Sequence, residues 1–235
     1  MAQTASGAAR WPLRLGVTAA IAFVAGPLLA HFGIVPAMTG FLLFDLGGLL
    51  GIIAVVFGVV AALRGRAAWT SLAPGIVIAA LFVTTAAGAG KYPRINDITT
   101  DTQNPPEFVQ ASSIPANQGR DMKYPGASFA QQQQAGYPDL KGLTLAVPPG
   151  DAYQRVLAAA KAMPSWQITR DDRVHLALEG IDSSRLFRFQ DDFVIEVRPH
   201  DGGSIVEMRS KSRDGKGDIG ANAKRIESFF AKLKG

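Results

Sequence analysis

The segment NDITTDTQNPPEF, residues 96–108, concentrates oxygen-bearing side chains. If this segment is extended, Asp97, Thr99 and Asp101 share one face, because successive side chains of a strand point to opposite sides. Two carboxylates and a hydroxyl in a row could contribute to a Ca²⁺ site, which takes about six to eight oxygen ligands. The same residue types also stabilise turns by binding nearby backbone. We therefore interpret the segment mainly as a structural strap, with ligand binding as the alternative.

The glycine-rich loop SRDGKGDIGAN forms a second candidate site. Its spaced acids resemble a calcium loop, but the twelfth position counted from Asp214 is Arg225, where such a loop requires an acid. As a turn before a helix, the loop could bind an anion such as a lipid headgroup phosphate through Arg213 and Lys216. The alternative is a loop that leaves a hairpin, with Asp218 capping the following helix.

A hydrolytic triad can be assembled on paper from His175, Asp182 and either Ser183 or Ser184. The chain has no G-x-S-x-G nucleophile elbow, and its histidines show no H-E-x-x-H spacing. His175 is the polar member of an alternating segment, so we interpret it as a structural or surface residue. We assign no catalytic residue, no metal ligand and no cofactor.

Alternating segments place five charged side chains on one face of the expected sheet: Glu179, Glu196, Arg198, Glu207 and Arg209. We predict that this face is exposed to solvent and carries cross-strand ion pairs. Each such pair contributes about 0.2–1 kcal/mol.

The net charge of +5 does not indicate a nucleic-acid-binding protein. Four of the arginines lie in the apolar first 90 residues, so the rest of the chain is close to neutral. No basic stripe with interleaved aromatics and no groove-reading motif is present in the sequence. The absence of cysteine excludes disulfides, thiolate catalysis and Cys-ligated metals.

Three apolar stretches are long enough to cross a bilayer, at residues 13–34, 41–63 and 69–90. A spanning helix needs about 20 apolar residues. None of the three shows the polar stripe that is typical of a core helix in a soluble protein. A cleaved signal peptide is the alternative for the first stretch, but no A-x-A site follows it. We predict a transmembrane anchor over residues 1–90.

Arginines flank these spans asymmetrically. Arg10 and Arg14 precede the first span, and Arg64 and Arg66 lie between the second and the third. The loop between the first and second spans has no basic residue, so the positive-inside rule places the N-terminus in the cytoplasm. Three crossings put the chain after Gly90 on the opposite side. We predict a multi-pass protein of the bacterial inner membrane with a periplasmic C-terminal domain.

Small residues line one face of the second span: Gly47, Gly51, Ala54, Gly58 and Ala61. Small side chains let helix backbones approach closely in lipid. We expect the stripe to pack against the first and third spans. A homo-oligomer through Gly47, Gly51, Ala54 and Gly58 is the alternative.

Asp45 is the one charged residue of the second span. It lies about 6 Å into the helix, close to the interface, and an acid in the first turn suits the helix dipole. His31 ends the first span on the same side, so we predict a pair between His31 and Asp45. An ion path would need further polar residues deeper in the spans, and the sequence has none there.

Residues 91–139 show little periodicity and contain YP, PP and IP dipeptides, which favour extended or turning chain. We predict an arm that wraps over the domain, with a short helix around residues 128–135. Its aromatic residues are spaced so that they can fill grooves.

Residues 140–235 show regular hydrophobic patterns. These patterns predict a strand, a helix, about four strands and a final helix. We predict a strand that includes Val174 and His175, and a turn at Asp191 and Asp192. Consecutive strands with tight turns indicate an antiparallel sheet with helices on one face. The expected fold is a membrane-anchored α+β protein.

Several stretches together resemble the domain-of-unknown-function 1499 family, which occurs in bacteria and plants: NDITTDTQNPPEF, YPG, YPDL, EGIDSSRLFRFQDDFVIEV and RSKSRDGKGDIGANAKRIESFF. The resemblance covers about residues 92–233, and its most specific parts are DITTDT and DIGxNAxRI. It implies membrane segments ahead of the domain, as in many members. It implies no activity, cofactor or catalytic residue.

Our first hypothesis is a non-enzymatic, membrane-tethered module that binds an envelope lipid or a partner protein. The expected contacts are the DITTDT arm and the loop of Arg213 and Lys216. Membrane lipids are expected partners, and nucleic acid is not. The alternatives are an envelope hydrolase that uses His175, and a structural subunit of a membrane complex assembled through the second span.

Overall fold

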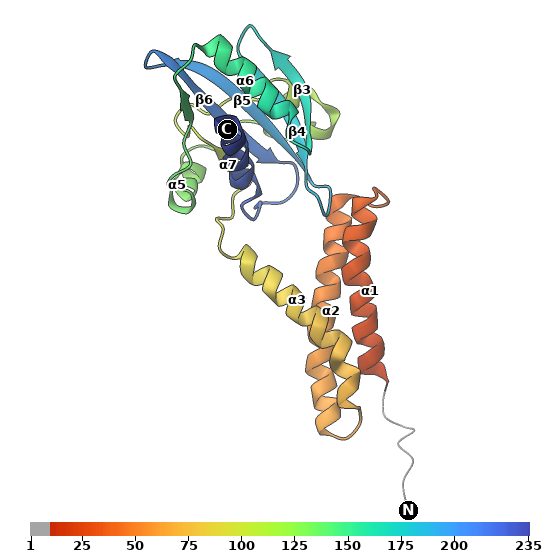
Figure 1. Cartoon of the computed structure of the whole chain (residues 1–235). Helices are drawn as coiled ribbons and strands as arrows, with labels where there is room; N and C mark the ends of the chain where they lie inside the picture. Colours follow the sequence, from red (N-terminus) through yellow and green to blue (C-terminus); the bar gives the residue numbers. More distant parts are fainter. Residues whose placement is uncertain (1–9) are drawn as a thin grey trace, which may run out of the picture. The chain divides into compact units, whose positions relative to one another are not determined.

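The computed structural model describes residues 10–235 and divides into two compact units (Figure 1). The first unit holds the N-terminal helices up to residue 91, together with residues 185–188. The second holds residues 92–184 and 189–235. Each unit has an apolar core of its own.

Three helices make up most of the first unit: α1 (Trp11–His31), α2 (Ala37–Leu63) and α3 (Ala73–Ala89), the last preceded by the 3-10 turn η1 (Trp69–Leu72). Proline in the first turn of α1 and of α3 suits a helix start, where no intrahelical N–H bond is lost. Each of the three, with η1 counted in the last, is long and apolar enough to cross a membrane. The three predicted spans are therefore confirmed as helices, with ends that differ by a few residues.

Glycines on α2 bring the neighbouring helices close. A side-chain carbon at Gly47 would lie 2.4 Å from the backbone nitrogen of Phe23 on α1. One at Gly48 would lie 2.2 Å from the ring of Phe82 on α3. The rest of the predicted small-residue stripe is buried as well: Gly51, Ala54, Gly58 and Ala61. The stripe packs inside this bundle, so a homo-oligomer through it would require the bundle to open.

Six strands form one antiparallel sheet in the second unit: β1 (Asp97–Thr99), β2 (Leu143–Leu145), β3 (Trp166–Asp172), β4 (Ala177–Ser183), β5 (Gln190–His200) and β6 (Gly203–Ser212). The strand order is β1-β6-β5-β4-β3, and β2 also pairs with β6. All pairs are antiparallel, which confirms the predicted α+β class.

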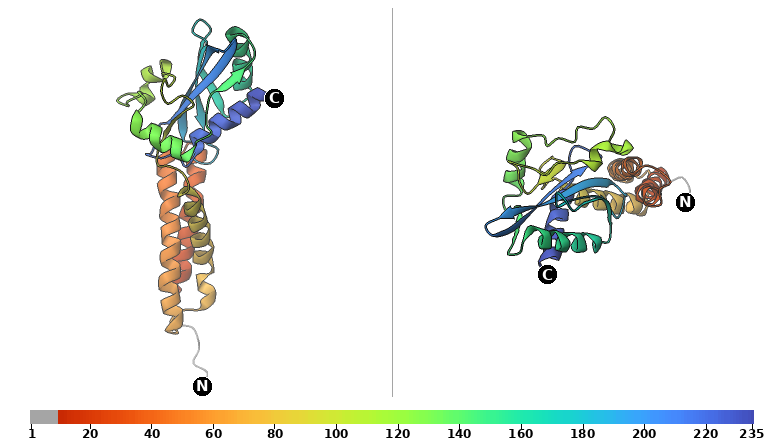
Figure 2. Two further views of the ribbon diagram at one scale, coloured as in Figure 1. Left: turned by 90° about the vertical axis from the view of Figure 1, so that its left-hand side faces the viewer. Right: turned by 90° about the horizontal axis from the view of Figure 1, so that it is seen from above.

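Helices α6 (Pro149–Lys161) and α7 (Ala221–Lys234) cover one face of this sheet (Figure 2). Phe193, Ile195 and Val197 alternate along β5 and point into the core beneath these helices. The helices contribute apolar stripes at helical spacing, among them Tyr153 and Phe229, both fully buried. This is the face that the alternating pattern of the strands predicts.

The arm covers the opposite face, and it includes α4 (Gln110–Ser113), the 3-10 turn η2 (Pro115–Asn117) and α5 (Ala127–Gly136). A small apolar cluster joins it to β5: Phe108, Ala111, Met122 and Val194. The predicted solvent-exposed face is therefore wrong, because Glu179, Glu207 and Arg209 are buried beneath the arm.

Two predicted turns and strands are also corrected. Asp191 and Asp192 lie inside β5 and are buried, so they form no turn. Residues 184–189 make the connection between β4 and β5 instead. Val174 and His175 lie in the turn between β3 and β4, where Val174 is 86% exposed. The predicted strand was too long, because the turn residues continue the alternation of apolar and polar side chains.

Candidate functional site

Asp97 of β1 has no exposed surface, and its carboxylate faces two cations of β6. Arg209 donates to it from Nε and Nη2, each at 2.8 Å. Nζ of Lys211 donates to Oδ2 of Asp97, also at 2.8 Å. The register of β1 on β6 places Asp97 opposite Lys211. Three cationic donors engage this carboxylate, so Asp97 is an ion-pair residue and is not free to bind Ca²⁺.

The guanidinium of Arg209 also ties the arm to the sheet. Its Nη1 donates to the carbonyl of Pro106 at 3.2 Å, and its Nη2 donates to the carbonyl of Met122 at 2.9 Å. The rings of Phe108 and Tyr124 lie with their centroids 4.7 and 5.5 Å from the guanidinium carbon. Buried charge is tolerated when it is paired and its donors are engaged, and Arg209 meets both conditions.

Thr99 and Thr100 attach the arm through its backbone. The N–H of Thr99 donates to Oε1 of Gln133 at 3.0 Å, and Nε2 of Gln133 donates to the carbonyl of Thr99 at 2.6 Å. The N–H of Thr100 donates to the carbonyl of Met208 at 2.9 Å, and the N–H of Met208 donates to Oγ1 of Thr100 at 2.9 Å. These bonds extend the sheet edge, which supports the strap interpretation of this segment.

Asp101 combines a turn with a partly exposed ion pair. Its Oδ1 accepts from the backbone N–H groups of Gln103 at 3.0 Å and Asn104 at 2.9 Å, the pattern of an Asx turn. Its Oδ2 accepts from Nη1 of Arg198 at 3.1 Å. Asp97 and Asp101 thus have separate partners, and the structure does not gather Asp97, Thr99 and Asp101 around one ion.

The loop before α7 holds one engaged cation and one free cation. Nε and Nη2 of Arg213 donate to the carboxylate of Asp192 at 2.9 and 2.6 Å, and Nη1 donates to Gln190 at 2.6 Å. Lys216 is exposed and has no hydrogen bond or ion pair within residues 10–235. The structure therefore does not bring Arg213 and Lys216 together as a two-cation anion site.

Asp218 binds the start of helix α7 from two residues before the N-cap position, which Gly220 occupies. Its carboxylate accepts from the backbone N–H groups of Gly220 and Asn222, both at 2.9 Å. Burial raises the pKa of Asp218, while these two N–H groups act in the opposite direction. The alternative interpretation of this loop, with Asp218 as the helix cap, agrees with this geometry.

A buried polar cluster joins α7 to the sheet, and the sequence patterns do not reveal it. Arg225 donates from Nε to Asp182 at 2.6 Å and from Nη2 to Asp191 at 2.5 Å. Its Nη1 donates to Ser210 at 2.8 Å and to Asn222 at 2.5 Å. Both carboxylates raise the pKa of Arg225 against the effect of burial. Arg225 therefore holds the helix in register on three strands.

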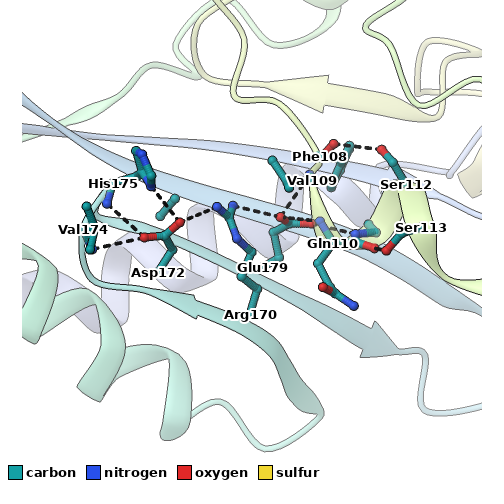
Figure 3. A network of polar contacts seen from close by, with 12 residues as sticks. Phe108, Val109, Gln110, Ser112, Ser113, Arg170, Asp172, Val174, His175 and Glu179 are labelled. Atoms are coloured by element: carbon teal, nitrogen blue, oxygen red, sulfur yellow. Dashed lines mark hydrogen bonds and ion pairs between the residues drawn. The ribbon is translucent and has the colours of Figure 1, made fainter.

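A chain of ion pairs runs from His175 to the arm (Figure 3). Nδ1 of His175 lies 2.9 Å from Asp172, Asp172 pairs with Arg170, and Arg170 lies 3.2 Å from Glu179. The backbone N–H and the ring of His175 lower the pKa of Asp172 to about 2. The fully buried Glu179 accepts from the first N–H groups of α4, including Ala111 at 2.8 Å.

The residues of the hydrolase alternative lie apart. His175 precedes β4, whereas Ser183 ends this strand and Ser184 follows it, and β4 is about 20 Å long. Asp182 accepts from Arg225, and the side chain of Ser184 accepts from the N–H of Phe189. No hydroxyl is hydrogen-bonded to His175 among the described residues, so the carboxylate and histidine pair lacks a nucleophile.

The predicted pair between His31 and Asp45 is not formed in the structure. No hydrogen bond or ion pair joins the two side chains within the part of the chain that is described. The predicted first-turn position of Asp45 is also wrong, because α2 begins at Ala37 and Asp45 lies in its third turn, about 12 Å from the helix start.

The edge of the sheet has a gap between its two short strands. β1 pairs with β6 down to Arg209, and β2 pairs with it up to Val206. Glu207 and Met208 lie between these two pairings and have no partner residue in β1 or β2. Thr100 fills part of the gap because it binds the backbone of Met208.

Glu207 is the buried acid that has no ion-pair partner at this gap, and it is only 6% exposed. Oγ1 of Thr100 donates to its Oε2, whereas Oε1 has no donor among residues 10–235. A side-chain carbon at Gly142 would lie 2.3 Å from that Oε1, so a larger residue there would displace the carboxylate from its present position. Burial raises the pKa of Glu207, and the nearby Asp101 raises it further.

A groove of about 450 Å³ opens beside Glu207. Its walls come from the strap, from α5 with the segment that follows it, and from β6. Asp101 and Lys141 add one charge of each sign, and Leu140 and Ile205 add apolar surface. The sequence patterns missed this site, because strand alternation placed Glu207 on an exposed face and no local signal indicates that the arm crosses it.

Two larger grooves also follow the arm, with volumes of about 750 and 580 Å³. The first includes Arg209, whose charge Asp97 neutralises. The second includes Arg170 and Arg198, each of which is ion-paired. These three arginines are ion-paired inside the protein, whereas Glu207 has no ion-pair partner among the described residues.

The fold and this groove define a membrane-anchored α+β protein with a candidate ligand site between arm and sheet. The chain belongs to the DUF1499 family, whose description is "Protein of unknown function", and residues 97–233 match the family model. Comparison with curated proteins finds no match. Among solved structures, one titled "Crystal structure of Ara h 8.0201" is 16% identical, covers 40% of this chain and 92% of its own, and has a TM-score of 0.31. A likeness of this extent carries no argument.

Proposed function

We propose that this protein is a non-enzymatic binding module tethered to the bacterial inner membrane, with its domain on the periplasmic side. Its ligand is an envelope lipid or part of a partner protein, held in the groove beside Glu207. This site replaces the arm carboxylates and the loop of Arg213 as the proposed contact, because those groups are engaged within the protein.

The orientation is supported by the basic residues around the spans. Arg10 precedes α1, and Arg64 and Arg66 lie between α2 and η1, whereas residues 32–36 contain no lysine or arginine. Short loops that are rich in arginine remain on the cytoplasmic side. An odd number of spans then carries the domain to the other side.

The observation that carries the binding role is the half-satisfied carboxylate of Glu207. Its Oε1 accepts from no protein donor within residues 10–235 and keeps access to solvent at the groove. A ligand with an N–H or O–H group can donate a charge-assisted hydrogen bond to this oxygen in place of water, so the groove favours such a molecule. No hydroxyl or histidine is hydrogen-bonded to Glu207 other than Thr100 in the described chain, which favours binding over catalysis.

Native mass spectrometry of the full chain, released from detergent, tests this proposal. We expect the wild-type protein to retain a small molecule and Glu207→Gln to lose it. Glu227→Gln is the matched control, because it makes the same change at an exposed position on α7. Equal retention by wild type and Glu207→Gln, or no retained molecule in either, would count against the groove as the ligand site.

A further inference from the structure

We infer that the groove beside Glu207 recognises a primary ammonium and a phosphate a few bonds apart, as the ethanolamine headgroup of an envelope phospholipid carries them. This inference rests on the proposed function, because it names the ligand of the same groove. Three features of the groove support it: its two acids, its lysine and its apolar surface.

The two acids of the groove are Glu207 and Asp101. Glu207 is 94% buried, its Oε2 is held by Thr100, and its Oε1 borders the groove without a donor in the described chain. Asp101 lines the same groove and shares its charge with the partly exposed Arg198. An ammonium has three donors and a full positive charge, so it satisfies the free oxygen and reduces the repulsion between the two acids.

A metal ion fits the two acids of the groove less well than an ammonium does. Ca²⁺ takes about six to eight oxygen ligands, most of them supplied by several carboxylates and carbonyls. Within residues 10–235, no group of three or more acidic or metal-ligating side chains could hold a metal. Two carboxylates, one of them already paired with arginine, match the smaller demand of an ammonium.

The lysine of the groove is Lys141, which precedes Gly142. It has no ion-pair partner among the described residues, and its separation from Glu207 exceeds the 4 Å limit of an ion pair. An exposed lysine just before β2 and a buried glutamate without an ion-pair partner leave both charges available to one ligand. The phosphate of a zwitterionic headgroup pairs with Lys141 while its ammonium reaches Glu207.

Leu140, Ile205 and Pro138 add apolar surface to the groove. Such surface can contact the carbon chain that links the two charged groups, or the glycerol that follows the phosphate. An inorganic ion would leave this surface unused. The groove therefore suits an organic zwitterion better than a simple salt ion.

The test uses the full chain in nanodiscs of phosphatidylcholine, titrated with glycerophosphoethanolamine and followed by calorimetry. Glycerophosphocholine is the matched probe, because its quaternary nitrogen keeps the charge and the phosphate but has no N–H donor. We expect saturable binding of the ethanolamine compound and affinity lower by about tenfold or more for the choline compound, the effect of losing charge-assisted hydrogen bonds.

Substitutions at Glu207 and Lys141 test the role of each charge in the groove. We expect Glu207→Gln to weaken binding of the ethanolamine compound by about tenfold. We expect Lys141→Gln to weaken binding of both compounds, because they share the phosphate. Lys216→Gln removes an exposed lysine elsewhere and is expected to change nothing. Glu207→Asp keeps the charge but moves the carboxylate away from the groove by one methylene group. We expect it to weaken binding, which provides a test if Glu207→Gln perturbs folding.

Equal affinity for the two compounds, or binding that is unaffected by Glu207→Gln, would overturn the inference. If the ethanolamine compound fails to bind while a molecule retained in native mass spectrometry still depends on Glu207, only the ligand class is wrong and the groove remains the binding site. Failure of both experiments removes the proposed function as well.

The source of the headgroup is tested by replacing the nanodisc lipid with phosphatidylethanolamine. We expect the soluble compound to bind more weakly there, because membrane lipid competes for the groove. Unchanged affinity would overturn the lipid as the source and assign the groove to a soluble zwitterion.

Discussion

Asp97 and Glu207 are buried acids on the same face of one sheet, yet their surroundings are opposite. Arg209 and Lys211 neutralise Asp97 with three donors, whereas Glu207 has one donor, from Thr100, in the described chain. A buried acid of the first kind holds the fold together. A buried acid of the second kind is costly to the fold, and such residues concentrate at functional sites.

Replacing Asp97 is expected to cost stability. Asp97→Asn leaves two buried cations without their counter-ion, and breaking a buried ion pair in this way costs about 3–5 kcal/mol. Asp101→Asn is the control, because its pair with Arg198 is partly exposed and such pairs contribute about 0–1 kcal/mol. Thermal unfolding followed by circular dichroism measures both variants. Equal melting temperatures for the two would contradict the anchoring role of Asp97.

Glu207 is expected to make stability depend on pH. Its pKa is raised in the folded protein, so the folded state holds the proton more tightly than the unfolded state does. The free energy of unfolding therefore falls as pH rises through the raised pKa. Glu207→Gln does not ionise, so it should be more stable than wild type above that pKa and similar below the unfolded pKa.

Unfolding of wild type and Glu207→Gln across a pH series checks this sign. The pKa of Asp218 is raised too, but Asp218 is present in both proteins and cancels in the difference. A difference in the free energy of unfolding between the two proteins that is constant with pH, or that grows at low pH, would show that Glu207 does not titrate as described.

At the scale of single elements, α7 depends on charge as well as on apolar packing. Arg225 carries contacts to Asp182 and Asp191 from different strands. Arg225→Ala leaves both carboxylates without a cation and is expected to cost about 3–5 kcal/mol. Lys224→Ala, at an exposed neighbouring position, is expected to stay within about 0.5 kcal/mol of wild type. Denaturant unfolding that finds the two variants alike would refute the polar attachment of α7.

The start of α7 offers a second test. Asp218→Ala removes the acceptor of two N–H groups, and loss of such a cap costs about 0.5–2 kcal/mol. Asp218→Asn keeps an acceptor oxygen and removes a charge that burial disfavours, so its melting temperature should lie closer to that of wild type. If Asp218→Asn is as unstable as Asp218→Ala, the helix is stabilised by the negative charge of Asp218 and not by its acceptor oxygen alone.

The elements themselves could largely be predicted from the sequence. The three spans follow from length and apolarity, and the inward residues of β5 follow from alternation. The prediction failed at Asp191 and Asp192, which resemble a turn locally. Asp191 binds Arg225 and Asp192 binds Arg213 on opposite faces of the strand, and such distant partners leave no local signal.

The arm explains most of what the sequence patterns missed. Its attachment depends on Arg209, Gln133 and backbone groups rather than on an apolar stripe, so periodicity cannot reveal where it lies. Once it covers the sheet, three of the five charges that were predicted to be exposed are buried: Glu179, Glu207 and Arg209. The polar residues of the DITTDT and DIGxNAxRI stretches, including Asp97, Asp218 and Arg225, then serve mainly to join elements.

At the scale of the whole molecule, the proposal requires that the domain and the N-terminus lie on opposite sides of the membrane. Three helices are long and apolar enough to span it, and an odd number of crossings has this consequence whatever the relative placement of the two units. An envelope ligand can reach the groove only in that arrangement.

The most direct test is therefore a pair of reporters fused after Gly235. Alkaline phosphatase needs disulfides, which form in the periplasm and not in the cytosol. We predict an active phosphatase fusion in living cells and an inactive fusion to a reporter that works only in the cytosol. A silent phosphatase fusion together with an active cytosolic reporter would contradict the account.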